Sequence, residues 1–229
     1  MRMSKEMRGL TNSMKTKVLS VIALMLCTLL QAQDNKATLA QIEKANEAIT
    51  TIEGKFSQTK TLSANGKEIK SEGTIYVSNG DKMAMHYDAP STDQLIINGD
   101  QFFMVRGKKK NHFNTEKNKA MRSLRNTLFY CIHGTPALLA EENNADIQVS
   151  KGNAGIVVTL TSQKKTPRGY ERIVLTYDSK TCLLNRMEMV EWGGNATLYE
   201  MKGLKTNATI EASVFDIPKK SSKDEAEGE

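Results

Sequence analysis

The pattern of hydrophobic and polar residues divides the chain into a helix, a long series of strands and a helical insert. Apolar residues recur at helical spacing over residues 37–52, which predicts an amphipathic helix that ends at Gly54. Thr38 and Gln41 fit a capping box near its start. After Gly54 the period changes to two, which is the period of β-strands with one face buried.

Asn-Gly pairs separate the first strands. Such pairs occur at Asn65-Gly66, Asn79-Gly80 and Asn98-Gly99, and an Asn-Gly pair between two alternating segments is typical of a β-hairpin. The spacing predicts an antiparallel meander, which Pro90 breaks once. The strands expected in this half cover residues 55–64, 67–77, 82–88, 94–97 and 101–106.

A helical insert then interrupts the meander. Residues 117–132 and 135–142 predict two helices separated by Gly134, and Pro136 stands where proline favours the start of a helix. The strands that follow cover residues 146–151, 155–162, 170–178, 183–192 and 196–204. No internal repeat or linker divides the chain. We therefore expect one domain over residues 33–218 and a disordered acidic tail over residues 219–229.

The alternation also assigns the two faces of the sheet. Ile156, Val158 and Leu160 share one face of their strand, whereas polar residues such as Arg172 and Glu188 occupy the opposite face of the next strands. About ten strands with one apolar face are expected to curl around that face. The sequence thus predicts a mainly β fold with helices (α+β) around an apolar interior.

Two uses of that interior remain open from the residues alone. Met at alternate strand positions is more often part of an ordinary core, which the helices would fill. With 12 Met and only 6% aromatic residues, however, the interior is also suited to flexible acyl chains, because methionine side chains adapt to variable apolar partners.

The first 32 residues have the features of a signal peptide. Basic residues precede an apolar run from Val18 to Leu30, which suits a signal peptide and is too short to span a membrane. We expect cleavage after Ala32, and translation that starts at Met14. The alternative is a lipid anchor on Cys27, although the preceding Leu26 is larger than the residue that lipidation signals prefer.

Charge and catalytic motifs exclude several classes of function. The chain has 32 basic and 26 acidic residues, a net charge of +6. Removing the leader leaves 27 and 25, a net charge of +2, so nucleic-acid binding loses its main support. Lys108, Lys109 and Lys110 follow Gly107 at an expected hairpin tip, either as a solvated turn or as a contact for anionic lipid heads or an acidic partner.

Candidate catalytic groups are few. The three histidines are His86, His112 and His133, and Cys131 is the only cysteine near one of them, at a spacing that does not aim both side chains at one ion on a helix. The sequence contains no G-x-S-x-G and no phosphate-binding glycine loop. We therefore expect no enzyme activity, no cofactor and no metal. Cys131 and Cys182 form either one disulfide or two buried free thiols.

Six short motifs follow one another along the chain. They are Phe56-Ser57-Gln58, Gly73-Thr74-Ile75-Tyr76-Val77, Tyr87-Asp88-Ala89-Pro90, Leu95-Ile96-Ile97-Asn98-Gly99-Asp100, Thr135-Pro136-Ala137-Leu138-Leu139 and Phe215-Asp216-Ile217-Pro218. In this order and spacing, behind a signal peptide and an amphipathic helix, they resemble the family of periplasmic outer-membrane lipoprotein carriers, LolA. The resemblance covers about residues 37–218.

The resemblance implies a fold and a function. The fold would be an unclosed antiparallel half-barrel of about 10–11 strands with an N-terminal helix and a helical lid. The function would be to shield the acyl chains of lipoproteins in the periplasm. A lipoprotein-releasing transporter of the inner membrane would deliver the cargo to a monomeric carrier, and an outer-membrane acceptor would receive it.

Candidate site residues follow from the alternation and the resemblance together. The expected lid residues are Leu128, Ile132, Leu138 and Leu139. The expected wall of the acyl-chain cavity consists of Phe56, Ile75, Met83, Met85, Tyr87, Val158, Leu175, Met187 and Met189.

One motif departs from the family pattern. The better-known carriers have an Arg-Pro pair after the strand that corresponds to residues 73–77, and that arginine helps to hold the lid closed. This chain has Ser78-Asn79-Gly80-Asp81 there, with Lys82 as the nearest base. Asn79 or Lys82 is therefore the candidate lid latch.

Two alternatives to a carrier are kept. One is an envelope-assembly enzyme or a lipid-binding accessory factor on the same half-barrel, which a cluster of ionisable groups in the cavity would favour. The other is a structural β domain in which tightly packed helices leave no cavity.

Overall fold

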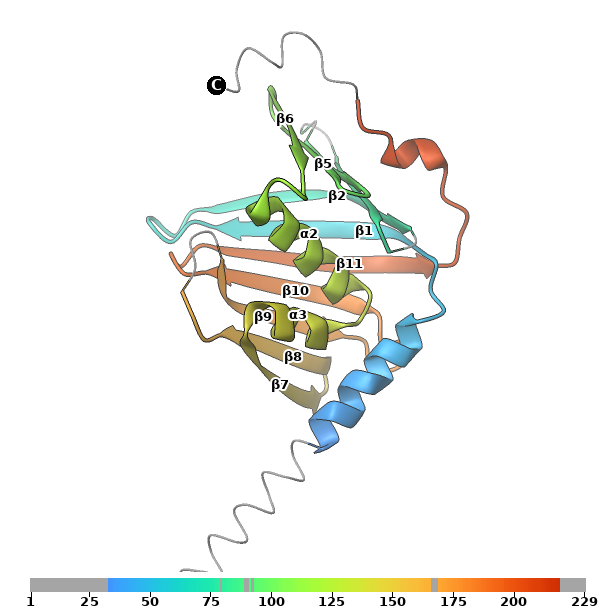
Figure 1. The fold of residues 1–229 in the computed structure, drawn as a ribbon, viewed down its shortest axis with the longest axis vertical. Coiled ribbons are helices and arrows are strands. Elements are labelled where there is room, and N and C mark those ends of the chain that lie inside the picture. The colour runs from blue at the N-terminus through green and yellow to red at the C-terminus, as the bar shows by residue number, and fades with distance from the viewer. Residues whose placement is uncertain (1–32, 79, 89–90, 92, 166–168, 219–229) are drawn as a thin grey trace, which may run out of the picture.

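A single antiparallel sheet of eleven strands forms the body of the protein (Figure 1). The computed structural model describes residues 33–78, 80–88, 91, 93–165 and 169–218. The expected signal peptide, the acidic tail, Asn79 and Pro90 lie outside these residues. The strand order is β6-β5-β4-β3-β2-β1-β11-β10-β9-β8-β7. Because β6 and β7 lie at opposite edges, the sheet is unclosed, as the half-barrel expectation required.

The strand boundaries agree closely with the alternation of the sequence. The first half consists of β1 (Thr51–Thr61), β2 (Glu68–Ser78), β3 (Lys82–Tyr87), β4 (Gln94–Asn98), β5 (Gln101–Arg106) and β6 (Lys109–Asn114). The second half consists of β7 (Ala145–Gly152), β8 (Gly155–Ser162), β9 (Tyr170–Tyr177), β10 (Leu184–Glu191) and β11 (Ala196–Thr206). Each half is a meander, and the pairing of β1 with β11 joins the two halves.

The N-terminal helix is shorter at its end than the sequence predicted. It covers residues 33–46, and Ile52 lies in β1 with its side chain buried. The β-branched residues from Ile49 to Ile52 favour a strand, and burial in the sheet overrides the helical spacing. Gly54 does not end the helix but lies inside β1, next to a register shift. A Cβ at Gly54 would approach Leu204 Cδ2 to 2.5 Å and the Lys202 carbonyl oxygen to 3.1 Å, so a larger residue there would force β11 or the Leu204 side chain to shift.

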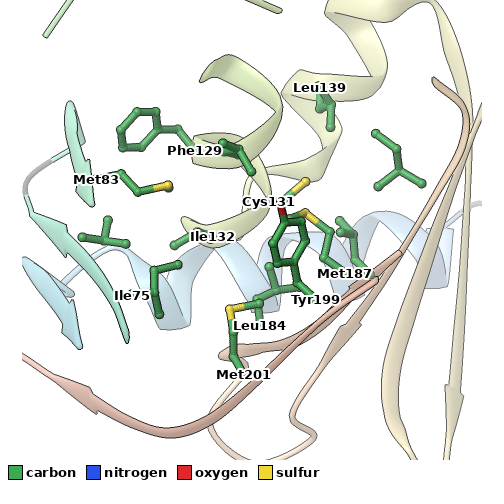
Figure 2. Close-up of a cluster of buried hydrophobic side chains, with 14 of the residues drawn as sticks. Ile75, Met83, Phe129, Cys131, Ile132, Leu139, Leu184, Met187, Tyr199 and Met201 are labelled. Carbon is green, nitrogen blue, oxygen red and sulfur yellow. The ribbon is translucent and has the colours of Figure 1, made fainter. Parts of the chain in front are cut away.

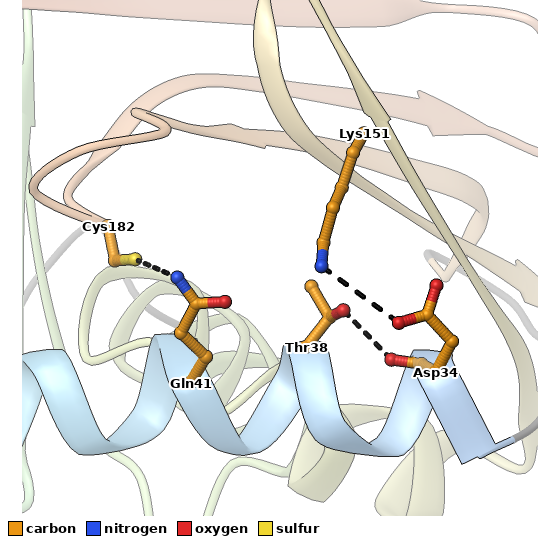
Figure 3. Close-up of polar contacts among 5 residues, drawn as sticks. All are labelled: Asp34, Thr38, Gln41, Lys151 and Cys182. Carbon is orange, nitrogen blue, oxygen red and sulfur yellow. Dashed lines mark hydrogen bonds and ion pairs between the residues drawn. The ribbon is translucent and has the colours of Figure 1, made fainter.

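The predicted capping box is also wrong. Thr38 lies inside the helix, and its hydroxyl donates to the Asp34 carbonyl at 2.8 Å. The Gln41 amide donates instead to the Cys182 sulfur at 3.9 Å (Figure 3). Asp34 forms an exposed ion pair with Lys151 at 4.0 Å. The helix therefore lies across the ends of β7 and of the β9–β10 hairpin.

The helical insert matches its prediction except at the start. Strand β6 was not expected, because Lys109 to Asn114 lack an alternating apolar pattern. Of the three lysines expected at the hairpin tip, only Lys108 lies in the turn. Helix α2 (Lys119–Ile132) begins with Asn118, whose side chain accepts a hydrogen bond from the Met121 amide. Helix α3 (Pro136–Asn143) follows after a short junction. Both helices lie across one face of the sheet (Figure 1).

The opposite face is not polar throughout, which corrects the expectation of one solvated face. Ala84, Ile96 and Phe103 face outward from β3, β4 and β5, and Phe215 of the C-terminal segment covers them. The Asn98 side chain donates to the Phe215 carbonyl at 3.2 Å. This outer cluster attaches the short 3-10 helix η1 (Ala212–Phe215) to the sheet. In the part of the chain that the structure describes, no helix has the length and hydropathy needed to span a membrane.

Candidate functional site

The inner face of the sheet carries an apolar wall of aliphatic, methionine and aromatic side chains. Eight of the nine predicted wall residues are at most 3% exposed, and Tyr87 is half-buried. They belong to one apolar cluster that extends from β1 through β3 on one side to β8 on the other. Tyr177, Tyr199 and Met201 belong to the same cluster but were not among the predicted wall residues. The alternation of buried Tyr199, exposed Glu200 and buried Met201 could have identified the last two.

Helices α2 and α3 cover this wall. Leu128, Ile132 and Leu139 are 2–4% exposed and belong to the same apolar cluster as the wall. Figure 2 shows Phe129, Ile132 and Leu139 on the helical side of the cluster, opposite strand residues that include Ile75 and Met83. Leu138, by contrast, is 47% exposed. Since adjacent residues of a helix point in different directions, only Leu139 of the pair faces the wall.

Very little empty space remains beneath the helices. A void of about 10 Å³ lies between the wall and the two lid residues Leu128 and Ile132. Ligand pockets usually measure several hundred Å³, so an acyl chain has no room in this state. Helix side chains fill the hollow, as the alternative of a structural β domain also predicts.

A second opening lies at the edge of the cover. This notch, of about 70 Å³, is enclosed by α2, α3, β8 and the start of β9. Leu139, Leu160 and Ile173 supply apolar lining, while Glu171 and Arg172 supply charged groups. The lining of the notch is therefore partly polar.

Two hydrogen bonds attach α2 to the sheet. The Arg125 guanidinium donates from Nε to the Gly99 carbonyl at 3.0 Å, and its carbon lies 5.2 Å from the centre of the Phe129 ring. The Tyr177 hydroxyl donates to the Cys131 carbonyl at 2.8 Å, and both residues are completely buried. These contacts hold the middle and the last turn of the helix, and neither contact has a local signal in the sequence.

The predicted latch residues do not make these contacts. Lys82 is half-buried at the start of β3, and within the described residues its side chain forms no hydrogen bond or ion pair with α2 or α3. Asn79 lies outside the described residues. The arginine that attaches the cover here is Arg125, which belongs to α2 itself. Its acceptor is the backbone carbonyl of Gly99.

The junction between α2 and α3 packs against the N-terminal helix. Gly134 has a φ of +71°, and a Cβ there would approach Asn46 Nδ2 to 2.8 Å and Ile42 Cγ2 to 2.9 Å. Asn46 in turn donates to the Cys182 carbonyl at 2.9 Å. Glycine is therefore required for both the backbone conformation and the close approach.

Burial shifts the pKa of several ionisable groups in the described part of the chain. Cys131 and Cys182 are free thiols, which answers the open question of the disulfide, and burial raises the pKa of the Cys131 thiol. Burial lowers the pKa of His133, whose ring stacks on Phe129 at 5.7 Å. His86 lies on the outer side, beside Tyr76. Within the described residues, no group of three His, Cys, Asp or Glu side chains could hold a metal ion.

The solved structures that align with this chain share little sequence with it. A DUF1329 family protein from Desulfovibrio piger aligns with a TM-score of 0.50 at 10% identity, over 81% of this chain and 97% of its own. A putative outer membrane lipoprotein-sorting protein domain from Vibrio parahaemolyticus aligns with a TM-score of 0.44 at 14% identity, over 78% and 95%.

The MucA/MucB complex of Pseudomonas aeruginosa gives a TM-score of 0.47 at 12% identity, over 81% of this chain but only 61% of the other. No curated protein matches the sequence. The family model of the outer membrane lipoprotein carrier protein LolA, however, matches residues 47–218, well over half of the chain. With the unclosed eleven-stranded sheet and its helical cover, this match shows that the chain belongs to the LolA family.

Proposed function

We propose that the protein is a periplasmic carrier that shields the acyl chains of lipoproteins and moves them from the inner to the outer membrane. The observation that carries this proposal is the inner wall, which is apolar and methionine-rich and is covered by two helices rather than by another sheet. Membership of the LolA family supports a role in binding lipoproteins.

The energetics favour a carrier with a movable cover. Hiding each CH₂ group from water is worth about 0.8 kcal/mol, so one 16-carbon chain represents roughly 12 kcal/mol. A lipoprotein therefore does not leave a membrane for water unaided. Transfer into an apolar hollow is close to neutral, because membrane and hollow are both apolar, and the cargo can be released again.

Opening exchanges one set of apolar contacts for another. Leu128, Ile132 and Leu139 occupy the space beside the wall when the cover is closed. If the helices move outward, acyl chains take the place of these side chains on Met83, Met85 and Met187. Methionine suits such a wall because its unbranched side chain adapts to different partners. Leu138, which is exposed, is not part of the proposed lid face.

The partners follow from this route. A transporter of the inner membrane would load the carrier, and an outer-membrane acceptor would receive the lipoprotein. The expected signal peptide over residues 1–32 would bring the chain to the periplasm. Since the wall lies within one chain, a monomer is sufficient for binding.

The test is transfer of lipid between two membranes. Donor vesicles contain a fluorescent triacylated lipopeptide, and acceptor vesicles contain none. The protein should speed the transfer in proportion to its concentration, and lipoproteins should copurify with it from the periplasm. Met85→Asp should abolish transfer, whereas Glu72→Gln, at an exposed position on the neighbouring strand, should not. Equal transfer with and without the protein would contradict a carrier function.

A further inference from the structure

The turn between β5 and β6 concentrates positive charge at one end of the sheet. Arg106, Lys108, Lys109 and Lys110 surround Gly107, and all five residues are exposed. We name the four bases the basic tip. The hairpin lies in the upper part of Figure 1, far from the N-terminal helix. The basic tip is therefore accessible to a large partner.

The charges of the basic tip are not neutralised within the described part of the chain. None of its four side chains forms an ion pair or a hydrogen bond there. The Asp93 carboxylate reaches the turn, but it accepts a hydrogen bond from the Gly107 amide at 2.7 Å. Arg106 and Lys109 are direct partners in the sheet, and like charges directly opposite each other are destabilising. An anionic partner would relieve this repulsion.

Protection of the sheet edge does not account for so much charge. Charged side chains, especially lysine, keep an exposed edge strand from pairing with other molecules. The other edge strand, β7, has one acidic and one basic residue, Asp146 and Lys151, and Lys151 forms an ion pair with Asp34. Four bases around a single turn exceed what this edge requires.

The directions of the side chains favour a lipid surface over a protein surface. Arg106 lies on the same face as Met104 of the inner cluster, and its partner Lys109 shares that face. Lys110 is paired with Val105, which packs in the outer cluster. Because the bases project from both faces of the hairpin, one protein surface would meet only some of them. A tip that enters a layer of lipid headgroups meets phosphates on both sides.

An exposed aliphatic residue lies at the same end of the sheet. Strands β1 to β6 are successive antiparallel neighbours, so the β1–β2 and β5–β6 turns lie at one end. Ile69, beside the β1–β2 turn, is 44% exposed, and Lys67 and Lys70 flank it in the sequence. Bases beside an exposed apolar side chain suit a membrane surface, where the bases meet the headgroups and the apolar group enters below them.

We propose that the basic tip docks the protein on membrane surfaces that contain anionic phospholipids. The proposal goes beyond the proposed function, since docking requires no bound lipoprotein. It assigns to the β5–β6 hairpin the task of holding the protein at the membrane.

The test is binding to vesicles that contain no lipopeptide. Protein that starts at Gln33 is sedimented with vesicles of phosphatidylcholine, either alone or mixed with phosphatidylglycerol. It should bind the mixed vesicles more tightly, and this binding should weaken as salt is added. Each base near an anionic surface strengthens binding about fivefold. The triple variant Lys108→Gln/Lys109→Gln/Lys110→Gln should therefore bind roughly a hundredfold more weakly.

Two further variants control for net charge and for folding. Lys180→Gln/Lys202→Gln/Lys205→Gln removes the same charge at exposed positions away from the hairpin and should keep most of the affinity, because salt screens distant charges. Lys109→Glu places an opposite charge across from Arg106. It should weaken vesicle binding roughly 25-fold without lowering the free energy of unfolding.

The possible failures are distinct. Equal losses in the two triple variants would contradict a local dock, because net charge alone would then explain the binding. No preference for the mixed vesicles at low salt would overturn the proposal and point to an acidic protein as the partner. Binding that occurs only after residues 219–229 are removed would show instead that the acidic tail covers the tip. Each of these results leaves the carrier function standing, because the vesicles hold no lipopeptide.

Discussion

The hydrogen bond between Tyr177 and Cys131 offers a sharp test of the movable cover. It joins the wall to the last turn of α2, at 2.8 Å and without access to solvent. Tyr177→Phe removes the hydroxyl and keeps the ring. The Cys131 carbonyl still accepts the Gly134 amide at 3.3 Å, so we expect a loss near the lower end of the usual range, about 1 kcal/mol.

The same substitution should strengthen lipid binding, because it weakens only the closed state. If the lipid binds only to the open state, the apparent affinity is proportional to the fraction of open molecules. A loss of about 1 kcal/mol in the closed state raises that fraction roughly fivefold. Tyr177→Phe should therefore lower the free energy of unfolding and yet bind a triacylated lipopeptide about fivefold more tightly.

Two measurements on one variant check this reasoning. Amide hydrogen exchange should show α2 and α3 less protected than β1 and β11 in the wild-type protein, and α2 should exchange about fivefold faster in Tyr177→Phe. Lipopeptide titration gives the affinity, with Tyr76→Phe as the control. Equal protection of α2 and β1, or weaker binding by Tyr177→Phe despite faster exchange, would refute a cover that opens as a separate unit.

Three further predictions concern the cover and its junction. Gly134→Ala should lower the free energy of unfolding by about 2–4 kcal/mol in urea titration, because it adds a clash with the N-terminal helix to the cost of a positive φ. Gly66→Ala also has a positive φ but open space around it, so it should cost about 1–2 kcal/mol, and equal losses would argue against the packed junction. Leu139→Ala should lower the free energy of unfolding by about 2–5 kcal/mol, whereas Leu138→Ala, at an exposed position, should change it by no more than about 0.5 kcal/mol. A larger loss for Leu138→Ala would mean that Leu138, and not Leu139, packs against the wall. Since burial lowers the pKa of His133 below 6.5, the folded state binds fewer protons than the unfolded state, and stability should fall as the pH drops below about 6.5. His133→Phe should reduce this fall in thermal unfolding between pH 7 and 5, and an unchanged pH dependence would remove His133 as its source.

The sequence predicted the sheet well, because the signals for strands are local. Alternation and turn residues placed β8 at residues 155–162 without error. The same local rule failed at β6, whose lysines and asparagines lack an apolar face, and at the N-terminal helix, where Ile49 and Ile52 fit two periods at once. There the pairing of β1 with β2 and β11 decided the outcome, and such pairing joins residues far apart in the chain.

The site was predicted in part for the same reason. Inward positions such as Met83 and Met187 follow from alternation, whereas the choice between Leu138 and Leu139 depends on how α3 is rotated on the sheet. The attachment of α2 through Arg125 and Tyr177 joins residues that are 26 and 46 positions from their partners. No spacing in the sequence encodes those contacts, and the latch prediction at Asn79 or Lys82 did not include Arg125 or Tyr177.

The most direct test of the account is to find where an acyl chain lies when it is bound. A triacylated lipopeptide with a photoreactive diazirine at the end of one chain is bound to the protein, irradiated, and the labelled residues are identified by mass spectrometry. Labels on the inner wall, at residues such as Met83, Met85, Met187 and Met189, are the expected result. Labels confined to the outer cluster around Phe103 and Phe215, or none at all under saturating lipopeptide, would contradict the claim that the covered hollow is where this protein holds lipid.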